Sequence, residues 1–170
     1  MRAPLTATLL LAASCSSGKD GSAPRSVELD AAAAAALFTF TQSWNDGAAR
    51  DTAAPTRYGT LYWPDAELVD PSGVVWNGQA AIVQMHRELW AGPFSASTVS
   101  GVVRRVRALS PTLIIADFDM ELRLAGPVPP GLAGPDGVIR THLKHVMEKR
   151  DGAWRVVAAQ NTFVMPPPQR

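Results

Sequence analysis

Three histidines are the side chains of this sequence best suited to exchange a proton near neutral pH. His145 is in phase with Leu143 and Met147 in an alternating segment, so we expect it to face the apolar side of a sheet together with Thr141. An imidazole there could bind a ligand or move a proton, or it could be a hydrogen-bonded histidine of the core. His142 has the opposite parity, so the pair cannot chelate one metal ion.

The third histidine belongs to a helical pattern. His86 lies on the apolar face of a helix predicted over residues 79–90. It is either a cap over a ligand pocket or a packed core residue. Aromatic candidates for the walls of the same pocket are Trp44, Tyr58 and Trp76, and the alternative for each is plain core packing.

Carboxylates and amides supply the other polar candidates. Asp117 and Asp119 share one face of a predicted strand, as a pair doing acid–base work would. The opposite face is uniformly apolar and must be the core, so both aspartates are assigned to the outer face, where Arg104 of the preceding strand is an expected partner. Gln160 and Asn161 point to opposite faces of the last predicted strand, so only one of them can enter a pocket.

The composition of the chain excludes several classes of protein. Its 170 residues suit one globular domain, and 16 Lys and Arg against 15 Asp and Glu give no electrostatic footprint for nucleic acid. The single Cys15 excludes an internal disulfide, a redox pair and a thiolate-rich metal site. There is no dinucleotide-binding glycine motif, P-loop, GxSxG or HExxH. We therefore expect no cofactor and no metal.

The first residues are typical of an export signal. An apolar run over residues 5–13 is too short to span a bilayer, so residues 1–14 are predicted to be a signal peptide. The run leads into Leu-Ala-Ala-Ser-Cys15, which resembles the lipobox of bacterial lipoproteins, although Ala12 replaces the leucine three residues before the cysteine. The alternative is an ordinary cleaved signal peptide. We expect an exported protein of a bacterial envelope, attached to a membrane by lipid on Cys15, with residues 15–28 as a flexible tether.

The rest of the chain divides into helices followed by strands. Asp30 is the expected N-cap of a long amphipathic helix that ends near Gly47, and a second short helix begins at Pro55. This order predicts an α+β domain over residues 29–165, followed by a tail, 166–170; its curved mixed or antiparallel sheet is covered on one face by three helices. The strands are predicted over residues 66–70, 74–76, 99–108, 113–124, 138–149 and 154–165.

Five pieces of sequence together carry a resemblance to a known superfamily. In their order and spacing they resemble the SnoaL-like superfamily, which has the cone-shaped fold of nuclear transport factor two and ketosteroid isomerase, and most closely its bacterial SgcJ/EcaC group. The resemblance implies a small, usually dimeric protein with a pocket between helices and sheet. The group's label is oxidoreductase, which the absence of a nucleotide-binding motif does not support. The pieces are Trp44-Asn-Asp-Gly47, residues 64–73, residues 78–82 with His86, Arg140-Thr141, and residues 151–162.

Asp70 is the most interesting carboxylate under this resemblance. The segment Asp70-Pro-Ser-Gly73 resembles the one that carries the general base of ketosteroid isomerase, which implies a strand end opening onto an apolar cavity. The alternative is a carboxylate that accepts hydrogen bonds from the amides of its own turn. The two groups that donate to the oxyanion in the isomerase fall on Phe40 and Val146, neither of which can donate, so steroid isomerisation is disfavoured. We predict a raised pKa for Asp70.

Two classes of function remain open from the sequence. The first is a non-catalytic module that binds a small, partly apolar molecule. The second is a cofactor-free isomerase, cyclase or hydratase in which Asp70 transfers a proton, with the help of His145. The absent oxyanion donors favour binding. We also expect a homodimer formed through the outer face of the sheet by Val102, Val106 and Ile115.

Overall fold

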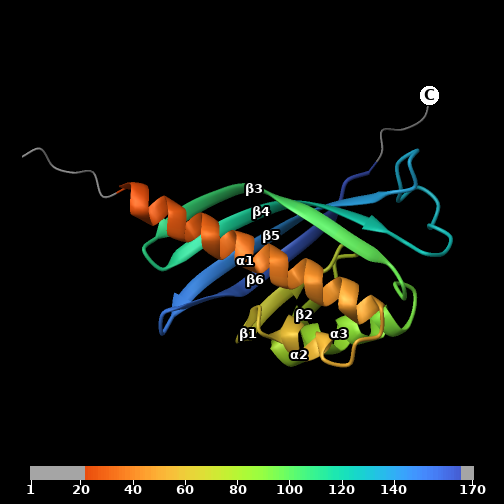
Figure 1. The fold of residues 1–170 in the computed structure, drawn as a ribbon, viewed down its shortest axis with the longest axis horizontal. Coiled ribbons are helices and arrows are strands. Elements are labelled where there is room, and N and C mark those ends of the chain that lie inside the picture. The colour runs from red at the N-terminus through yellow and green to blue at the C-terminus, as the bar shows by residue number, and fades with distance from the viewer. Residues whose placement is uncertain (1–21, 166–170) are drawn as a thin grey trace, which may run out of the picture.

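The computed structural model describes residues 22–165, and three helices pack there on a six-stranded sheet. The long helix α1 lies across the sheet, and α2 and α3 lie beside its C-terminal half (Figure 1). This arrangement confirms the predicted α+β fold. In chain order the elements are α1 (Ser22–Ala48), α2 (Ala54–Gly59), β1 (Tyr62–Val69), β2 (Val75–Asn77), α3 (Gln79–Ala91), β3 (Thr98–Ser110), β4 (Leu113–Arg123), β5 (Ile139–Arg150) and β6 (Ala153–Phe163).

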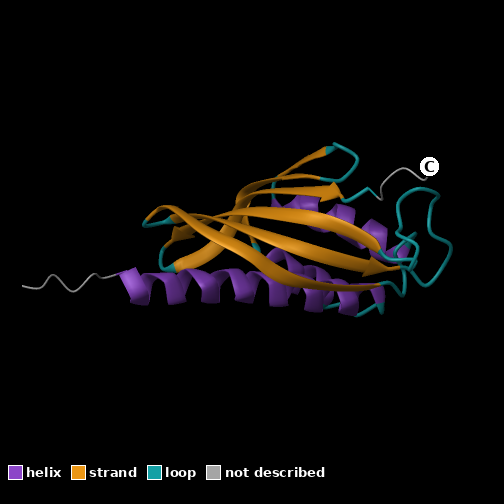
Figure 2. Cartoon of the chain, turned by 90° about the horizontal axis from the view of Figure 1, so that it is seen from above, coloured by secondary structure: helices purple, strands orange, loops and turns teal. Residues whose placement is uncertain are grey.

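The sheet is mixed, and its strands run in the order β2-β1-β6-β5-β4-β3. Strand β1 is parallel to β6, and the other neighbouring strands are antiparallel. The sheet curves, and the helices cover one of its faces (Figure 2). We call this the inner face and the opposite one the outer face.

Alternation along β4 and β5 determines which residues fill the core. On β4 the buried side chains include Ile114, Ala116 and Phe118, and the strand pairing places these opposite Met147, His145 and Leu143 of β5, respectively. The apolar face predicted for β4 is therefore the inner face. Asp117 and Asp119 point outward, as expected, and pair with Lys144 and His142 of β5.

The C-terminal end of α1 is joined to the sheet by side-chain hydrogen bonds. The Nδ2 of Asn45 donates to the carbonyl of Val99 at 3.0 Å, and the Val99 amide donates to Oδ1 of Asn45 at 2.7 Å. The indole of Trp44 donates to Oγ of Ser97 at 3.0 Å. The Trp44-Asn-Asp-Gly47 piece thus has a structural role, because it attaches α1 to the start of β3.

The predicted N-terminal boundary of α1 is wrong. The helix begins at Ser22, so Asp30 lies within it and is not an N-cap. The reason is tertiary: Glu28 accepts hydrogen bonds from Lys149 and Trp154, and Leu29 is buried, so this turn packs on the sheet. The helix therefore includes part of the segment predicted to be a tether.

The predicted signal peptide, Cys15 and the tail over residues 166–170 lie outside the described residues. Within residues 22–165, no helix combines the length and the apolar character needed to cross a bilayer. Export, lipid attachment and the domain boundaries remain predictions.

A register shift in β3 corrects two expectations for the outer face. The shift falls between Val103 and Arg105, so Arg105 rather than Arg104 stands opposite Asp117. Val106 then pairs with Ala116 and packs against the core, so it does not belong to the outer face. The predicted dimer stays a prediction, with Val106 removed from its proposed surface.

Candidate functional site

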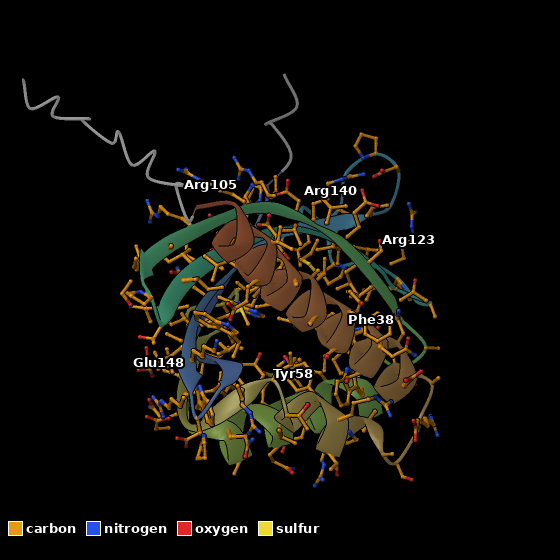
Figure 3. The ribbon with its side chains drawn as sticks, turned by 60° about the vertical axis from the view of Figure 1, so that its left-hand side comes forward. Phe38, Tyr58, Arg105, Arg123, Arg140 and Glu148 are labelled. Carbon is orange, nitrogen blue, oxygen red and sulfur yellow. The ribbon has the colours of Figure 1, made fainter. Side chains whose placement is uncertain are left out.

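A buried polar network connects the two short helices and the first strand. The hydroxyl of Tyr58 on α2 lies 3.0 Å from that of Tyr62 on β1 and 2.8 Å from Nε2 of His86 on α3. The Nδ1 of His86 lies 2.8 Å from the carbonyl oxygen of Ile82, one turn earlier in α3. In Figure 3, Tyr58 lies among the side chains that fill the space between the helices and the sheet.

The chemistry of the Ile82 carbonyl gives this network a direction. A carbonyl oxygen only accepts, so Nδ1 of His86 carries the proton and Nε2 has the lone pair. Tyr58 must then donate its hydroxyl proton to Nε2, and Tyr62 must donate to the oxygen of Tyr58. The chain therefore runs from Tyr62 through Tyr58 to His86 and uses every hydroxyl proton.

All three members of the chain are uncharged at neutral pH. Burial lowers the pKa of His86 to about 4, and the hydrogen bond to Ile82 only partly opposes this. Burial raises the pKa of Tyr58 well above its ordinary value, and neighbouring Tyr62 raises it further. Burial also raises the pKa of Tyr62, against a smaller lowering by its hydrogen bond with Tyr58. The network stays neutral because the charged form of each group is poorly solvated there.

His145 lies beside this network in an aromatic environment. Its ring is fully buried, with ring centroids at 5.1 Å from Phe118, 6.4 Å from Phe40 and 6.4 Å from Tyr62. Burial lowers its pKa to about 3, so the ring is neutral and has one donor and one acceptor nitrogen. Neither nitrogen has a hydrogen-bond partner among the described residues. Each such buried group costs roughly 1–3 kcal/mol of folding free energy, so His145 destabilises the core compared with an apolar residue of similar size.

Several of the predicted pocket residues meet here. The rings of Trp44 and His86 are 5.8 Å apart and those of Tyr58 and His86 are 4.2 Å apart, and Phe40 packs against both Trp44 and His145. Helical spacing on α1 and α3 and strand parity on β5 place Trp44, His86 and His145 on buried faces, as the sequence predicted.

The amide pair on β6 and Thr141 on β5 are also placed by register. Asn161 pairs with Leu143 and is half-buried on the inner face, whereas Gln160 pairs with Lys144 and is exposed on the outer face. Of the two predicted candidates, Asn161 is the one that can face a ligand between helices and sheet. Thr141 is buried on the inner face, as expected.

Asp70 and Trp76 form a separate unit at the edge of the sheet. Oδ1 of Asp70 accepts from the amide of Ser72 at 2.8 Å, from its hydroxyl at 2.6 Å and from the amide of Val74 at 3.1 Å. Oδ2 accepts from the indole of Trp76 at 3.1 Å. Burial raises the pKa of Asp70, but the bonds from Ser72, Trp76 and Val74 together outweigh it, and the pKa lies below its ordinary value. The predicted raised pKa is wrong, because the charged carboxylate is held by its own turn.

Among residues 22–165, no hydrogen bond joins Asp70 to His145, the two residues predicted to be catalytic. The member of the buried network that the sequence analysis did not single out is Tyr62. It follows Tyr58 at i+4, a spacing that would put both rings on one face of a helix, yet Tyr62 is the first residue of β1. Among the described residues, no group of three His, Cys, Asp or Glu side chains is arranged to hold a metal ion.

Comparison with known proteins gives a fold but no family. No family model matches the sequence, and no curated protein matches it. Solved structures do match. A protein with a cystatin-like fold from Caulobacter vibrioides is 25% identical with a TM-score of 0.66, over 82% of this chain and 92% of that one.

Two further solved structures have names that refer to reactions. A putative scytalone dehydratase from Novosphingobium aromaticivorans is 14% identical, with a TM-score of 0.64 over 84% of this chain and 89% of that one. A hexachlorocyclohexane dehydrochlorinase from Novosphingobium barchaimii is also 14% identical, with a TM-score of 0.63 over 86% and 94%. These likenesses establish the cone-shaped fold of nuclear transport factor two for this chain.

Proposed function

We propose that this protein binds a small, partly apolar molecule between the helices and the sheet, and that His145 is the residue that recognises its polar group. The observation that carries this proposal is the pair of unpartnered ring nitrogens of His145 in a fully buried, aromatic environment. A ligand that satisfied them would recover free energy that the empty fold loses.

The chemistry of the site favours a ligand with a hydroxyl group on an apolar or aromatic body. A neutral imidazole offers one donor and one acceptor, and a hydroxyl can complement either of them. Phe40, Phe118 and Tyr62 would then contact the apolar part. Because His145 has no exposed surface, entry requires a movement of the overlying side chains, of which Phe40 on α1 is one.

A second candidate is a cofactor-free enzyme that removes a proton from its substrate. Dehydratases and dehydrochlorinases, as two similar structures are named, catalyse eliminations, which require a base. Here the base would be His145, with the Tyr62-Tyr58-His86 chain beside it. A general base works best with a pKa near the operating pH, and the pKa of His145 is about 3. Binding is therefore the better-supported function.

The test compares His145→Phe with Met147→Leu, a change on the same strand and the same inner face. Native mass spectrometry of the chain purified from its own host is expected to show a small-molecule adduct on the parent and on Met147→Leu, and none on His145→Phe. Urea unfolding should show His145→Phe to be at least as stable as the parent, because two unpaired nitrogens have been removed. An adduct retained by His145→Phe, or absent from the parent, would refute the proposal.

We also propose that the protein is an exported lipoprotein, on the basis of the sequence that ends at Cys15. Expression of the full chain in a lipoprotein-processing bacterium should give a membrane-associated protein whose N-terminal peptide carries acyl mass on Cys15. A soluble product without that mass would contradict it.

A further inference from the structure

The helical layer has a cleft of its own. It is formed by the C-terminal end of α1, the connection to α2, and the last turn of α3, and has a volume of about 230 Å³. Its lining combines apolar surface from Pro55 and Trp90 with the side chains of Arg50, Asp51 and Arg87.

The two arginines give this cleft an uncompensated positive charge. Arg50 and Arg87 are exposed, and neither forms an ion pair with any side chain that the structure describes. The carboxylate of Asp51 accepts from the amide of Ala53 at 2.9 Å and from Arg57 at 3.2 Å, and Asp46 pairs with the same Arg57 at 2.6 Å. Arg50, Arg57 and Arg87 against these two carboxylates leave a net charge of +1. The hydrogen bond from Ala53 contributes most, and that from Arg57 next, to lowering the pKa of Asp51. Asp51 therefore stays charged as a partner of Arg57.

Trp90 lines the same cleft with its ring, and its indole N–H is buried. Its side chain is 3% exposed, and its indole Nε1 has no hydrogen-bond partner among the described residues. The ring is held edge-on by Trp44 and Tyr58, at centroid distances of 6.2 Å and 5.6 Å. Two unpaired guanidinium groups in a cleft lined by an aromatic ring suit a ligand that accepts several hydrogen bonds and is negatively charged.

The backbone of Arg50 indicates that the fold itself does not select an arginine there. Arg50 has φ of +70°, in the left-handed region, where it closes the end of α1 by donating its amide to the carbonyl of Gly47. Glycine adopts this conformation at lower cost than a residue with a Cβ atom. A long charged side chain at this position is therefore consistent with a role outside the fold.

We infer that this cleft binds the carboxylate of a small organic acid. Arg50 and Arg87 neutralise the carboxylate, and Pro55 and the Trp90 ring contact the apolar part of the acid. The inference is independent of the function proposed above, because Trp90 separates this cleft from the Tyr58 and His86 side chains that it packs against.

The test titrates the isotopically labelled full-length chain with benzoate and with benzyl alcohol, its uncharged analogue, and follows the indole N–H signal of Trp90 by NMR. The signal is assigned by its loss in Trp90→Phe. Benzoate is expected to shift it in a saturable way, because the Trp90 ring lines the cleft, whereas benzyl alcohol is expected to leave it in place.

Three arginine variants test which residues are responsible for the affinity. Arg87→Gln and Arg50→Gly are each expected to weaken benzoate binding about tenfold or more, because each removes a charged hydrogen-bond donor. Arg107→Gln removes an exposed, unpaired arginine on β3 and should not change the affinity. Arg50→Gly should also raise the melting temperature, so its loss of binding cannot come from unfolding.

Equal shifts with benzoate and benzyl alcohol, no shift with either, or unchanged affinity in Arg50→Gly and Arg87→Gln would overturn the inference. Tighter binding of inorganic phosphate than of benzoate would overturn the assignment to an organic acid. His145→Phe should bind benzoate with the same affinity as the parent. The benzoate test is therefore independent of the test of the proposed function.

Discussion

The indole of Trp76 and the carboxylate of Asp70 join β2 to the turn that precedes it, through a hydrogen bond of 3.1 Å between Nε1 and Oδ2. The other oxygen of Asp70 accepts from Ser72 and Val74 within the same turn. All four hydrogen bonds of this carboxylate therefore hold the β1-β2 hairpin together.

We predict that Asp70→Asn destabilises the protein at neutral pH by about 1 kcal/mol, which allows for partial exposure of the carboxylate. The folded pKa of Asp70 is lowered, so its contribution is present above the ordinary value of 3.8 and is lost as pH falls through the folded pKa. Thermal melts at pH 7 and pH 3 should show a difference between variant and parent that shrinks in acid. An Asp70→Asn variant as stable as the parent at pH 7 would restore the general-base hypothesis.

The central position of Tyr58 in the buried network predicts unequal effects for the two tyrosines. Tyr58→Phe leaves the Nε2 of His86 and the hydroxyl of Tyr62 without their partner, at a cost of about 3 kcal/mol. Tyr62→Phe removes only the first donor and leaves the Tyr58 to His86 bond intact, at about 1 kcal/mol. Urea unfolding of both variants measures the order. A larger loss for Tyr62→Phe would contradict the central position of Tyr58 in this network.

Acid should destabilise the protein through its buried histidines. The folded pKa values of His86 and His145, about 4 and about 3, lie below the ordinary 6.5, so the unfolded chain binds protons first as pH falls. Stability is therefore complete above pH 6.5, and each histidine removes roughly 1.4 kcal/mol per pH unit between 6.5 and its folded pKa.

Urea unfolding at several pH values from 7.5 to 5 tests this, because the window lies above the range of the carboxylates. His145→Phe should lose about half as much stability as the parent between pH 6.5 and 5, since one of the two buried histidines is gone. Equal losses in parent and variant would mean that His145 does not carry this effect.

Parts of the fold that depend on local periodicity could be predicted from the sequence. The alternation along β4 and β5 identified the inner face, and it placed His145 and Thr141 on that face and both aspartates of β4 on the other. The phase of Trp44 and His86 on their helices was likewise local information. These are the residues for which sequence and structure agree.

Features that depend on contacts distant in sequence could not be predicted. The start of α1 rests on Glu28 meeting the β5-β6 hairpin, more than a hundred residues later. The shift near Arg105 reverses the face of Val106, although no residue type there signals a bulge. For Asp70 both alternatives were visible in the sequence, and the donor from Trp76 added to the turn's own bonds decides between them.

Gly47 is the position where a small change should have the largest effect on packing. In the interior of a helix, Gly→Ala ordinarily stabilises by up to about 1 kcal/mol. Here a Cβ atom would lie 2.5 Å from Cδ2 and Cε3 of Trp90, whose ring is held on its other sides by Trp44 and Tyr58. We therefore predict the opposite sign, a loss of roughly 2–3 kcal/mol in Gly47→Ala.

Gly101→Ala on β3 is the matched control for this prediction. Its Cβ atom would also lie 2.5 Å from a neighbour, but that neighbour is Sδ of Met120, in a flexible side chain that can move aside. It should lose less, about 1 kcal/mol. Urea unfolding compares the two, and tryptophan fluorescence should change only in Gly47→Ala, because that variant displaces an indole. A Gly47→Ala variant as stable as Gly101→Ala would mean that the Trp90 ring can shift, and that the cleft it lines is not rigid.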